Sequence, residues 1–135
     1  MYDYQCKIVR VVDGDTVDVD IDLGFNTWRC GERIRLYGVD TPECRTRDDE
    51  EKAAGLLAKK FVADCLHIGG SYRLETKGKG KFGRYLGTIK LDDQISINGM
   101  LISEGLAVAY HGQNKDLVER QHKENIAKLK EKGLI

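Results

Sequence analysis

Residues 35–43 read Arg-Leu-Tyr-Gly-Val-Asp-Thr-Pro-Glu, and the chemistry of the chain centres on this stretch. The residues that lead into it alternate between polar and apolar from 33 to 38, which is the period of a β-strand. Pro42 has no N–H to donate to a central ladder, so the strand must give way to a loop near Asp40 and Glu43. Loops held by rigid strands often carry catalytic and binding residues, although an ordinary strand end with solvated charges has the same pattern.

A second strand is predicted at residues 17–23, ahead of this stretch. Apolar residues at every second position face one way, while Asp18, Asp20 and Asp22 face the other way and are expected only to be solvated. Asp15 falls on the apolar face when the alternation is extended backwards. A carboxylate that points inward is costly without a cation or hydrogen bonds, so we expect Asp15 to have a partner.

The order of predicted elements indicates an α+β fold in one domain over residues 1–135. A five-stranded OB-fold β-barrel with three helices is the smallest common architecture that fits this order. Asn98 is expected to cap the second helix, and Leu117, Ile126 and Leu129 are the main apolar positions of the third. Strands are predicted at 7–12, 17–23, 33–38, 71–76, 85–91 and 95–97. Helices are predicted at 48–65, 98–104 and 116–132.

A second segment with chemical potential is the glycine- and lysine-rich run at residues 77–84. Its glycines allow a backbone to approach a ligand closely, and its lysines and Arg84 supply positive charge for phosphates. It is not a Walker A loop, because the Gly-Lys-Ser/Thr ending is absent. A basic hairpin tip without a ligand is the alternative.

The net charge of the chain does not indicate what kind of partner it binds. Lys and Arg number 22, as do Asp and Glu. Residues 1–50 hold 12 acids and 7 bases, whereas residues 51–135 hold 10 acids and 15 bases. This asymmetry is expected of a cation site beside an anion-binding face, and equally of a solvated mixture of surface charges.

The sequence lacks the motifs of zinc sites, EF-hand loops and membrane-spanning segments. The four cysteines are widely spaced, with no Cys-x-x-Cys pair or nearby His, so free thiols are expected and zinc is not. An EF-hand loop that starts at Asp13 lacks the required Gly and closing Glu. The first residues show no signal-peptide pattern and no apolar run could span a membrane, so we expect a soluble intracellular protein.

Three motifs, taken in order, resemble the staphylococcal (micrococcal) nuclease family. They are Asp-Gly-Asp-Thr-Val at 13–17, Arg-Leu-x-x-Val-Asp-Thr-Pro-Glu at 35–43 and Lys-Phe-Gly-Arg at 81–84. The resemblance implies an OB-fold barrel with three helices, and a calcium-dependent endonuclease that hydrolyses DNA and RNA to leave 3'-phosphate ends. The segment between the first two motifs is longer than is usual in the family, so the first hairpin should project further.

The resemblance also implies roles for the acidic residues of these motifs. Asp15 and Asp40 match the carboxylates that bind calcium, and the backbone carbonyl of Thr41 matches a further ligand. Calcium takes several oxygen ligands, so this set leaves room for water and a phosphate oxygen. Glu43 matches the residue usually assigned as the general base.

The basic and aromatic residues of the motifs match groups that hold the substrate. Arg35 and Arg84 correspond to the two catalytic arginines that bind phosphate. Lys81 and Phe82 fall where the family has a lysine and an aromatic residue beside the nucleotide, and Tyr110 lies near an aromatic residue of the base pocket. These last three are looser matches, because Phe82 lacks a tyrosine hydroxyl and the alignment near Tyr110 is offset by one residue.

Two alternatives to an enzyme remain open from the sequence. A catalytically silent module on the same fold would bind nucleic acid or protein, and such domains typically lose part of the acid and arginine set. A purely structural OB-like domain would leave the inward Asp15 and the basic run at 77–84 without a role. The sequence therefore favours a nuclease that acts on nucleic acid, with single strands preferred, as a monomer and away from membranes.

Overall fold

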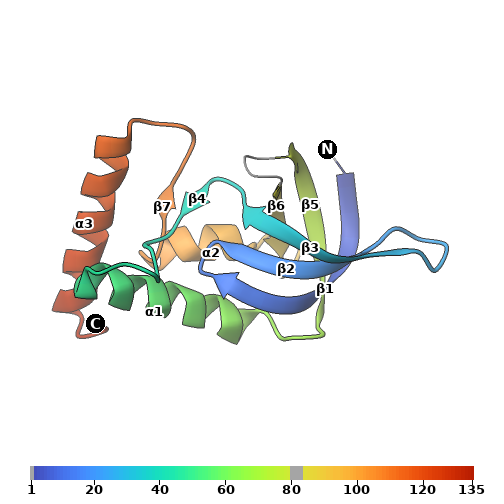
Figure 1. Ribbon diagram of the computed structural model, residues 1–135, viewed down its shortest axis with the longest axis horizontal. Helices are drawn as coiled ribbons and strands as arrows, with labels where there is room; N and C mark the ends of the chain where they lie inside the picture. The colour runs from blue at the N-terminus through green and yellow to red at the C-terminus, as the bar shows by residue number, and fades with distance from the viewer. Residues whose placement is uncertain (1, 80–83) are drawn as a thin grey trace.

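The computed structural model describes residues 2–79 and 84–135. Its strands are β1 (Tyr2–Asp13), β2 (Thr16–Asp22), β3 (Trp28–Leu36), β4 (Val39–Asp40), β5 (Ser71–Lys79), β6 (Tyr85–Lys90) and β7 (Val108–Ala109). Its helices are α1 (Asp49–Cys65), α2 (Ile97–Ser103) and α3 (Lys115–Glu131). Five strands close into a barrel in the order β1-β2-β3-β6-β5, and β4 pairs with β7 in a separate two-stranded sheet (Figure 1). The predicted α+β fold, an OB-fold barrel with three helices, is confirmed.

The barrel closes through its one parallel pair of neighbouring strands, β3 and β6. Ile34 lies opposite Tyr85 and Arg35 opposite Leu86, whereas the other four neighbouring pairs of barrel strands are antiparallel. Because β6 follows directly after Arg84, this closure brings the basic segment of the sequence beside the end of β3. Two stretches that are distant in the chain therefore meet at one edge of the barrel.

The core forms where the alternating strands meet one face of α1. Val17, Val19 and Ile21 of β2 are buried, as the alternation requires, whereas Leu23, the last predicted apolar position, lies past the end of the strand and is exposed. Ala54, Ala58 and Val62 recur at helical spacing and are also buried, so α1 packs its apolar side against the barrel. Figure 1 shows α1 running beneath β1 and β2, with α3 standing at the end away from the β2–β3 hairpin.

The outer aspartates of β2 do more than the solvation that the sequence predicted. Asp18 forms an ion pair with Arg33, with 2.9 Å between Oδ1 and Nε. Asp20 accepts a hydrogen bond from the N–H of Gly31 at 2.8 Å, and Asp22 accepts one from Gly24 at 2.8 Å. The prediction was wrong because the β2–β3 hairpin brings partners from its second arm to Asp18 and Asp20, and the turn after β2 supplies one to Asp22.

Asn98 does not cap α2. Ser96 is the cap, and its Oγ accepts a hydrogen bond from the N–H of Gly99. Asn98 is buried, where its side chain accepts from the N–H of Ile89 and donates to the carbonyl oxygens of Tyr37 and Gly87. The expected strand at 95–97 is also wrong, since only Ser96 forms an isolated bridge, to Lys90, before the helix begins.

Two of the three apolar positions predicted for α3 are buried, and the third is wrong by one residue. Leu117 is exposed, whereas Val118 is buried together with Ile126 and Leu129. Positions 118, 122, 126 and 129 follow helical spacing, so they lie on a single face. His122 therefore belongs to the inward side of α3, a placement that the choice of Leu117 had concealed.

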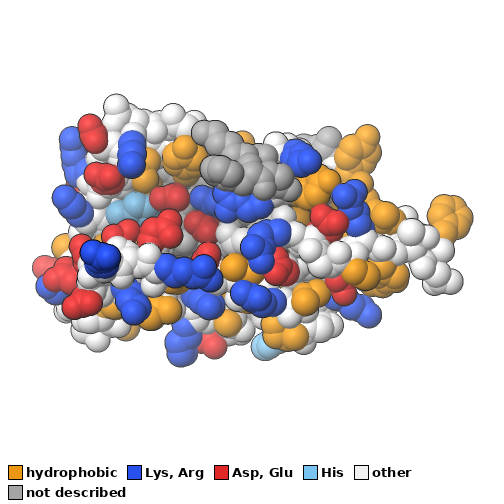
Figure 2. All heavy atoms as spheres, in the orientation of Figure 1, with side chains coloured by type: hydrophobic (Ala, Val, Ile, Leu, Met, Phe, Trp, Pro, Cys, Tyr) orange, Lys and Arg blue, Asp and Glu red, His pale blue; other side chains and the backbone are white. Residues whose placement is uncertain are grey.

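The surface carries charges of both signs, as the composition predicts. Figure 2 shows acidic side chains gathered between the barrel and α3, with lysines and arginines around them. All four cysteines lie in the described part of the chain and are free thiols. Within the described ranges, no helix has both the length and the apolar character needed to cross a membrane.

Candidate active site

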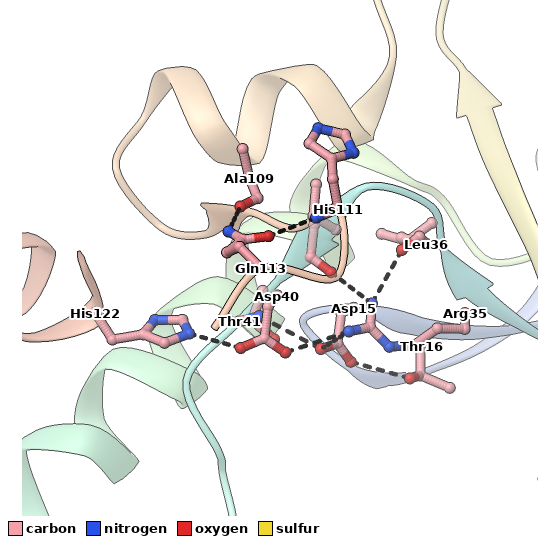
Figure 3. Close-up of polar contacts among 11 residues, drawn as sticks. Asp15, Thr16, Arg35, Leu36, Asp40, Thr41, Ala109, His111, Gln113 and His122 are labelled. Carbon is pink, nitrogen blue, oxygen red and sulfur yellow. Dashed lines mark hydrogen bonds and ion pairs between the residues drawn. The ribbon is translucent and has the colours of Figure 1, made fainter. Parts of the chain in front are cut away.

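Two carboxylates meet at one guanidinium beside the end of β3. The Nη2 of Arg35 lies 3.4 Å from Oδ2 of Asp15 and 3.3 Å from Oδ1 of Asp40. Asp15 comes from the turn between β1 and β2, while Asp40 ends β4 (Figure 3). The side chains of Arg35 and Asp15 are only 16% and 15% exposed, so this contact is stronger than a surface ion pair. The partner that the sequence demanded for Asp15 is thus Arg35.

Backbone oxygens hold this arginine in place. Its Nη1 donates to the carbonyl of Leu36 at 2.9 Å and to that of Val39 at 2.7 Å. Because the guanidinium is planar, fixing Nη1 also fixes the direction of Nη2 towards the carboxylates. The turn at 37–38 therefore sets the geometry of the acidic pair.

Both oxygens of Asp15 have partners within the protein. Oδ1 accepts a hydrogen bond from the hydroxyl of Thr16 at 3.0 Å, and Oδ2 accepts one from the N–H of Thr41 at 3.4 Å. Thr41 is buried, so the loop that follows β4 is held against the β1–β2 turn. Asp15 and Asp40 are therefore carried by two backbone segments that a hydrogen bond joins, the β1–β2 turn and β4 with the loop that follows it.

Glu43 extends the acidic group on the exposed side of the loop. Partial burial raises the pKa of its carboxyl above the ordinary value, and the nearby charges of Asp15, Asp13, Asp40 and Glu51 raise this pKa further. Negative charge is therefore in excess around Glu43. A bound cation would relieve this repulsion.

Helix α1 supports the loop that carries Glu43. A Cβ placed on Gly55 would lie 2.7 Å from the carbonyl oxygens of both Pro42 and Glu43. Only a glycine allows the helix to approach this backbone so closely. The position of Glu43 thus depends on a residue of α1 as well as on its own loop.

The donor chemistry fits a hard cation, although the number of side-chain donors is small. Across residues 2–79 and 84–135, no group of three or more His, Cys, Asp or Glu side chains is arranged to hold a metal ion. A cation here would rest on Asp15 and Asp40, completed by a backbone oxygen such as that of Thr41 and by water. Calcium and magnesium accept such oxygen sets, whereas zinc prefers nitrogen and sulfur.

A cavity of about 480 Å³ adjoins the acidic pair on the other side of Arg35. Its described lining contains no Asp or Glu. Gln113 supports one wall, since it accepts a hydrogen bond from the N–H of His111 and donates to the carbonyl of Ala109. The lining residues are Arg35, Leu36, Tyr37, Gly38, Val39, Arg84, Leu86, Tyr110, His111 and Gly112.

The sequence of this site matches a known family. The family described as staphylococcal nuclease homologue matches residues 33–134, which include the end of β3, the strands β5 and β6, all three helices, Arg35 and Asp40, but not β1, β2 or Asp15. The chain belongs to the staphylococcal nuclease family. The resemblance drawn from the three motifs is therefore confirmed at the level of the family.

Individual members of the family show how far the similarity extends. The chain is 37% identical to a thermonuclease of Staphylococcus intermedius over 123 residues, which cover 87% of this chain and 68% of that protein. It is 30% identical to a micrococcal nuclease of Shigella flexneri over 121 residues, 84% of this chain and 62% of that protein. It is 29% identical to protein ParB of Escherichia coli over 120 residues, 82% of this chain and 60% of that protein. The chain thus spans less than two thirds of two of these three relatives.

One polar residue of this nuclease-family site was not predicted. The Nε2 of His122, on α3, lies 2.7 Å from Oδ2 of Asp40. A carboxylate only accepts hydrogen bonds, so Nε2 is the donor and the proton lies on that nitrogen. The spacing of four residues from Val118 and from Ile126 was the signal that would have placed His122 on the inward face.

The structure brings most of the predicted site residues into two adjoining groups. Asp15 and Asp40 share Arg35, with Thr41 in contact with the first of them, and Glu43 follows on the same loop. Arg84 and Tyr110 lie instead in the cavity wall, and Arg35 belongs to both groups. Lys81 and Phe82 lie outside the described residues. Tyr37 and His111, which the sequence did not single out, also line the cavity.

Proposed function

We propose that the chain is a calcium-dependent nuclease that hydrolyses phosphodiester bonds of DNA and RNA, with single strands preferred. The observation that carries this proposal is the position of Arg35, which contacts both acidic residues and also lines the basic cavity. A phosphate beside Arg35 would lie between a cation site and a nucleotide pocket. Membership of the nuclease family and the thermonuclease and micrococcal nuclease relatives support the same activity.

The two arginines would hold the scissile phosphate. Arg35 and Arg84 line the same cavity, and Arg35 is also paired with Asp15 and Asp40. Guanidinium groups bind phosphate oxygens through paired hydrogen bonds. These contacts strengthen as negative charge gathers on the oxygens in the transition state, and that difference lowers the barrier.

Asp15, Asp40 and the carbonyl of Thr41 would bind the calcium ion. When bound, the ion would supply Lewis-acid polarisation of the phosphoryl group. A cation here would offset the repulsion among Asp15, Asp40 and Glu43, which, after partial burial, adds to the raised pKa of Glu43. Calcium rather than magnesium is proposed from the family resemblance.

Glu43 would act as the general base. Its carboxylate would take a proton from a water molecule, whose oxygen attacks the phosphorus atom while the bond from phosphorus to the 5' oxygen breaks. The departing 5' oxygen gains a proton from solvent, which leaves a 3'-phosphate and a 5'-hydroxyl. General-base assistance of this kind is typically worth about 10²–10⁴-fold in rate.

The aromatic residues in the walls of the cavity support the proposed preference for single strands. Tyr37 and His111 approach edge to face, with ring centroids 6.5 Å apart, and Tyr110 stands on the same loop as His111. A flat aromatic wall accepts a base on its face, and a base is available for this only when it has left a duplex stack. Lys81 and Phe82 are proposed to add contacts to the nucleotide.

A second candidate function is a binding module without catalysis. Arg35 already forms ion pairs with both carboxylates, and the described residues hold no three-ligand metal cluster. An acidic pair that is satisfied by an arginine needs no cation to persist. The protein would then bind single strands through the cavity and leave them intact.

Cleavage of labelled oligonucleotides separates the two functions. Fluorescent single-stranded DNA and RNA would be incubated with the protein and calcium, magnesium or EDTA, beside an Arg84→Ala variant. We expect calcium-dependent products with 3'-phosphate ends, and a loss of at least about 10²-fold in the variant. Salt-sensitive binding without any products in calcium would support the binding module instead.

A further inference from the structure

A second cavity, of about 380 Å³, opens at the end of the barrel remote from α3. Figure 2 shows hydrophobic side chains gathered at this end, around β1, β5 and the β2–β3 hairpin. None of the described residues that line the cavity is acidic, and three of them are tyrosines. The lining residues are Tyr2, Tyr4, Ile21, Leu23, Arg29, Thr76, Lys77, Gly78 and Tyr85.

Arg29 and Tyr85 form a platform in this cavity, made of a guanidinium beside an aromatic ring. The guanidinium carbon of Arg29 lies 5.4 Å from the centroid of the Tyr85 ring, and Nη2 donates to the Tyr85 hydroxyl at 3.1 Å. Glu32 holds the Nε of Arg29 at 2.9 Å and offsets part of its charge, but Glu32 does not line the cavity. A planar cation stacked on an aromatic ring is a surface that nucleic-acid bases and phosphates both favour.

The opposite wall carries aromatic surface that the core does not use. Tyr4 is half-buried and packs against the core, so its ring has a structural role. Tyr2 is 69% exposed, and its ring centroid lies 6.3 Å from that of Tyr4. An exposed ring beside a buried one, across a cavity from a cation, leaves space for a third flat group.

Lys77 and the start of β6 lie between the second cavity and the first. Lys77 lines the second cavity, and its Nζ lies 5.6 Å from the ring centroid of Tyr37, which lines the first. Along β6, Arg84 and Leu86 face the first cavity while Tyr85, between them, lines the second. Basic and aromatic groups therefore follow one another from the candidate active site to the far end of the barrel.

We propose that the second cavity binds another nucleotide of the same single strand, so that the substrate extends from the catalytic cavity past Lys77 to the Arg29–Tyr85 platform. This inference rests on the proposed function, since it takes the first cavity as the place where the scissile phosphate binds. A base would stack in the second cavity, and Arg29 and Lys77 would contact the backbone phosphates. Short substrates would fill only the first cavity, while longer ones would gain the second.

Two exposed positions test this without disturbing the core. Tyr2→Ser removes the exposed ring, and Arg29→Gln removes the cation. Arg33→Gln is the matched control for charge, because Arg33 also lies on β3, is similarly exposed (47% against 55%) and forms an acid pair of the same 2.9 Å length. Phe25→Ser is the control for aromatic surface, since Phe25 is fully exposed at the hairpin tip and does not line either cavity.

Binding would be measured by fluorescence anisotropy in EDTA, with a labelled thymidine dinucleotide and a labelled ten-nucleotide thymidine strand. We expect Tyr2→Ser and Arg29→Gln each to weaken binding of the ten-nucleotide strand about 5- to 100-fold, with little change for the dinucleotide. Arg29→Gln should also reduce the slope of log affinity against log salt by about 0.7, whereas Tyr2→Ser should leave this slope unchanged. Both controls should bind like the wild type.

Cleavage of the same two substrates in calcium tests the nuclease proposal independently of the second binding site. If the cavity variants lose affinity for the ten-nucleotide strand alone but the wild type cuts neither substrate, the nuclease proposal is wrong and the second site stands. If the wild type cuts both substrates and the cavity variants bind both like the wild type, the second site is wrong and the nuclease stands. Equal losses in the control variants, or equal losses for the dinucleotide, would also overturn the second site. The cavity would then have another use, such as contact with a protein.

Discussion

The Nε2 of His122 lies 2.7 Å from Oδ2 of Asp40, although 82 residues separate them in the sequence. Oδ1 of the same carboxylate faces Nη2 of Arg35 at 3.3 Å, so both oxygens of Asp40 are held from opposite sides. One partner comes from the barrel and the other from α3. The orientation of a proposed calcium ligand is therefore set by the docking of the last helix.

Replacing His122 should weaken calcium binding. His122→Ala frees Oδ2 of Asp40, and partners of this kind typically contribute about 10- to 100-fold to metal affinity. His122→Gln keeps an N–H donor and should restore part of the loss. Calcium titration by calorimetry, without substrate, would measure both. His67→Ala, which alters an exposed histidine, is the control, and equal calcium affinity in His122→Ala and the control would contradict the prediction.

Glu43→Gln should slow cleavage and yet stabilise the metal-free protein. We expect a rate loss of about 10²–10⁴-fold, because a neutral amide cannot accept the proton of water. The pKa of Glu43 is raised in the folded state by partial burial and by nearby acids, so the wild type loses stability as pH rises from about 4.5, the ordinary pKa, through the raised value. The variant lacks this loss.

Urea unfolding in EDTA over a series of pH values would test the effect on stability. The wild type and Glu43→Gln should have similar midpoints below pH 4, and the variant should have the higher midpoint near pH 7. A lower midpoint for Glu43→Gln at pH 7 would show that its carboxylate forms a stabilising contact instead.

Gly55→Ala should impair catalysis more than folding. The added Cβ would lie 2.7 Å from the carbonyl oxygens of Pro42 and Glu43, so the loop that carries Glu43 must move. A displacement of about 1 Å near a reacting group can cost about 10²-fold in rate. The same change in a helix interior otherwise favours the helix by up to about 1 kcal/mol.

The kinetic and unfolding measurements on Gly55→Ala would be compared with Gly99→Ala in α2. A Cβ on Gly99 would meet only the Ser96 hydroxyl, at an ordinary 3.4 Å, so this control should retain the wild-type rate. If kcat is unchanged in Gly55→Ala, the approach of α1 to the loop does not position Glu43.

Cys6 should make the protein sensitive to alkaline pH. Burial raises the pKa of its thiol from 9.0 to about 11. The folded state therefore holds the proton more tightly than the unfolded state, so the stabilising contribution is complete below pH 9 and is lost between about pH 9 and 11. The loss amounts to about 2 to 3 kcal/mol of unfolding free energy.

Denaturant unfolding of the wild type and Cys6→Ala from pH 7 to 11 would measure this contribution as the difference between their profiles. The variant should be less stable at pH 7, because it loses buried volume, but its stability should fall less steeply above pH 9. Cys30→Ala removes an exposed thiol and should follow the wild type. Parallel profiles for the wild type and Cys6→Ala would contradict the assignment.

Local sequence was sufficient for the elements and for much of the candidate site. The alternation at residues 17–23, the helical spacing from Ala54 to Val62 and the motifs around Asp15 and Arg35 all predicted what the structure contains. The strand and helix signals repeat over several residues, and a repeated side-chain direction identifies an element whatever it later contacts. The fold class followed from the order of these elements, and the family from the resemblance of the three motifs.

The positions that local pattern misjudged are those whose partners come from distant segments. Asn98 looked like a helix cap, but its amide joins β6 and Tyr37 in the interior. His122 was missed because the choice of Leu117 in place of Val118 hid the spacing of four residues that puts His122 on the buried face of α3. The chain itself specifies where strands and helices form, since those depend on near neighbours. Closure of β3 on β6 and docking of α3 depend on long-range packing, and they alone bring His122 to Asp40 and Arg84 to the cavity of Arg35.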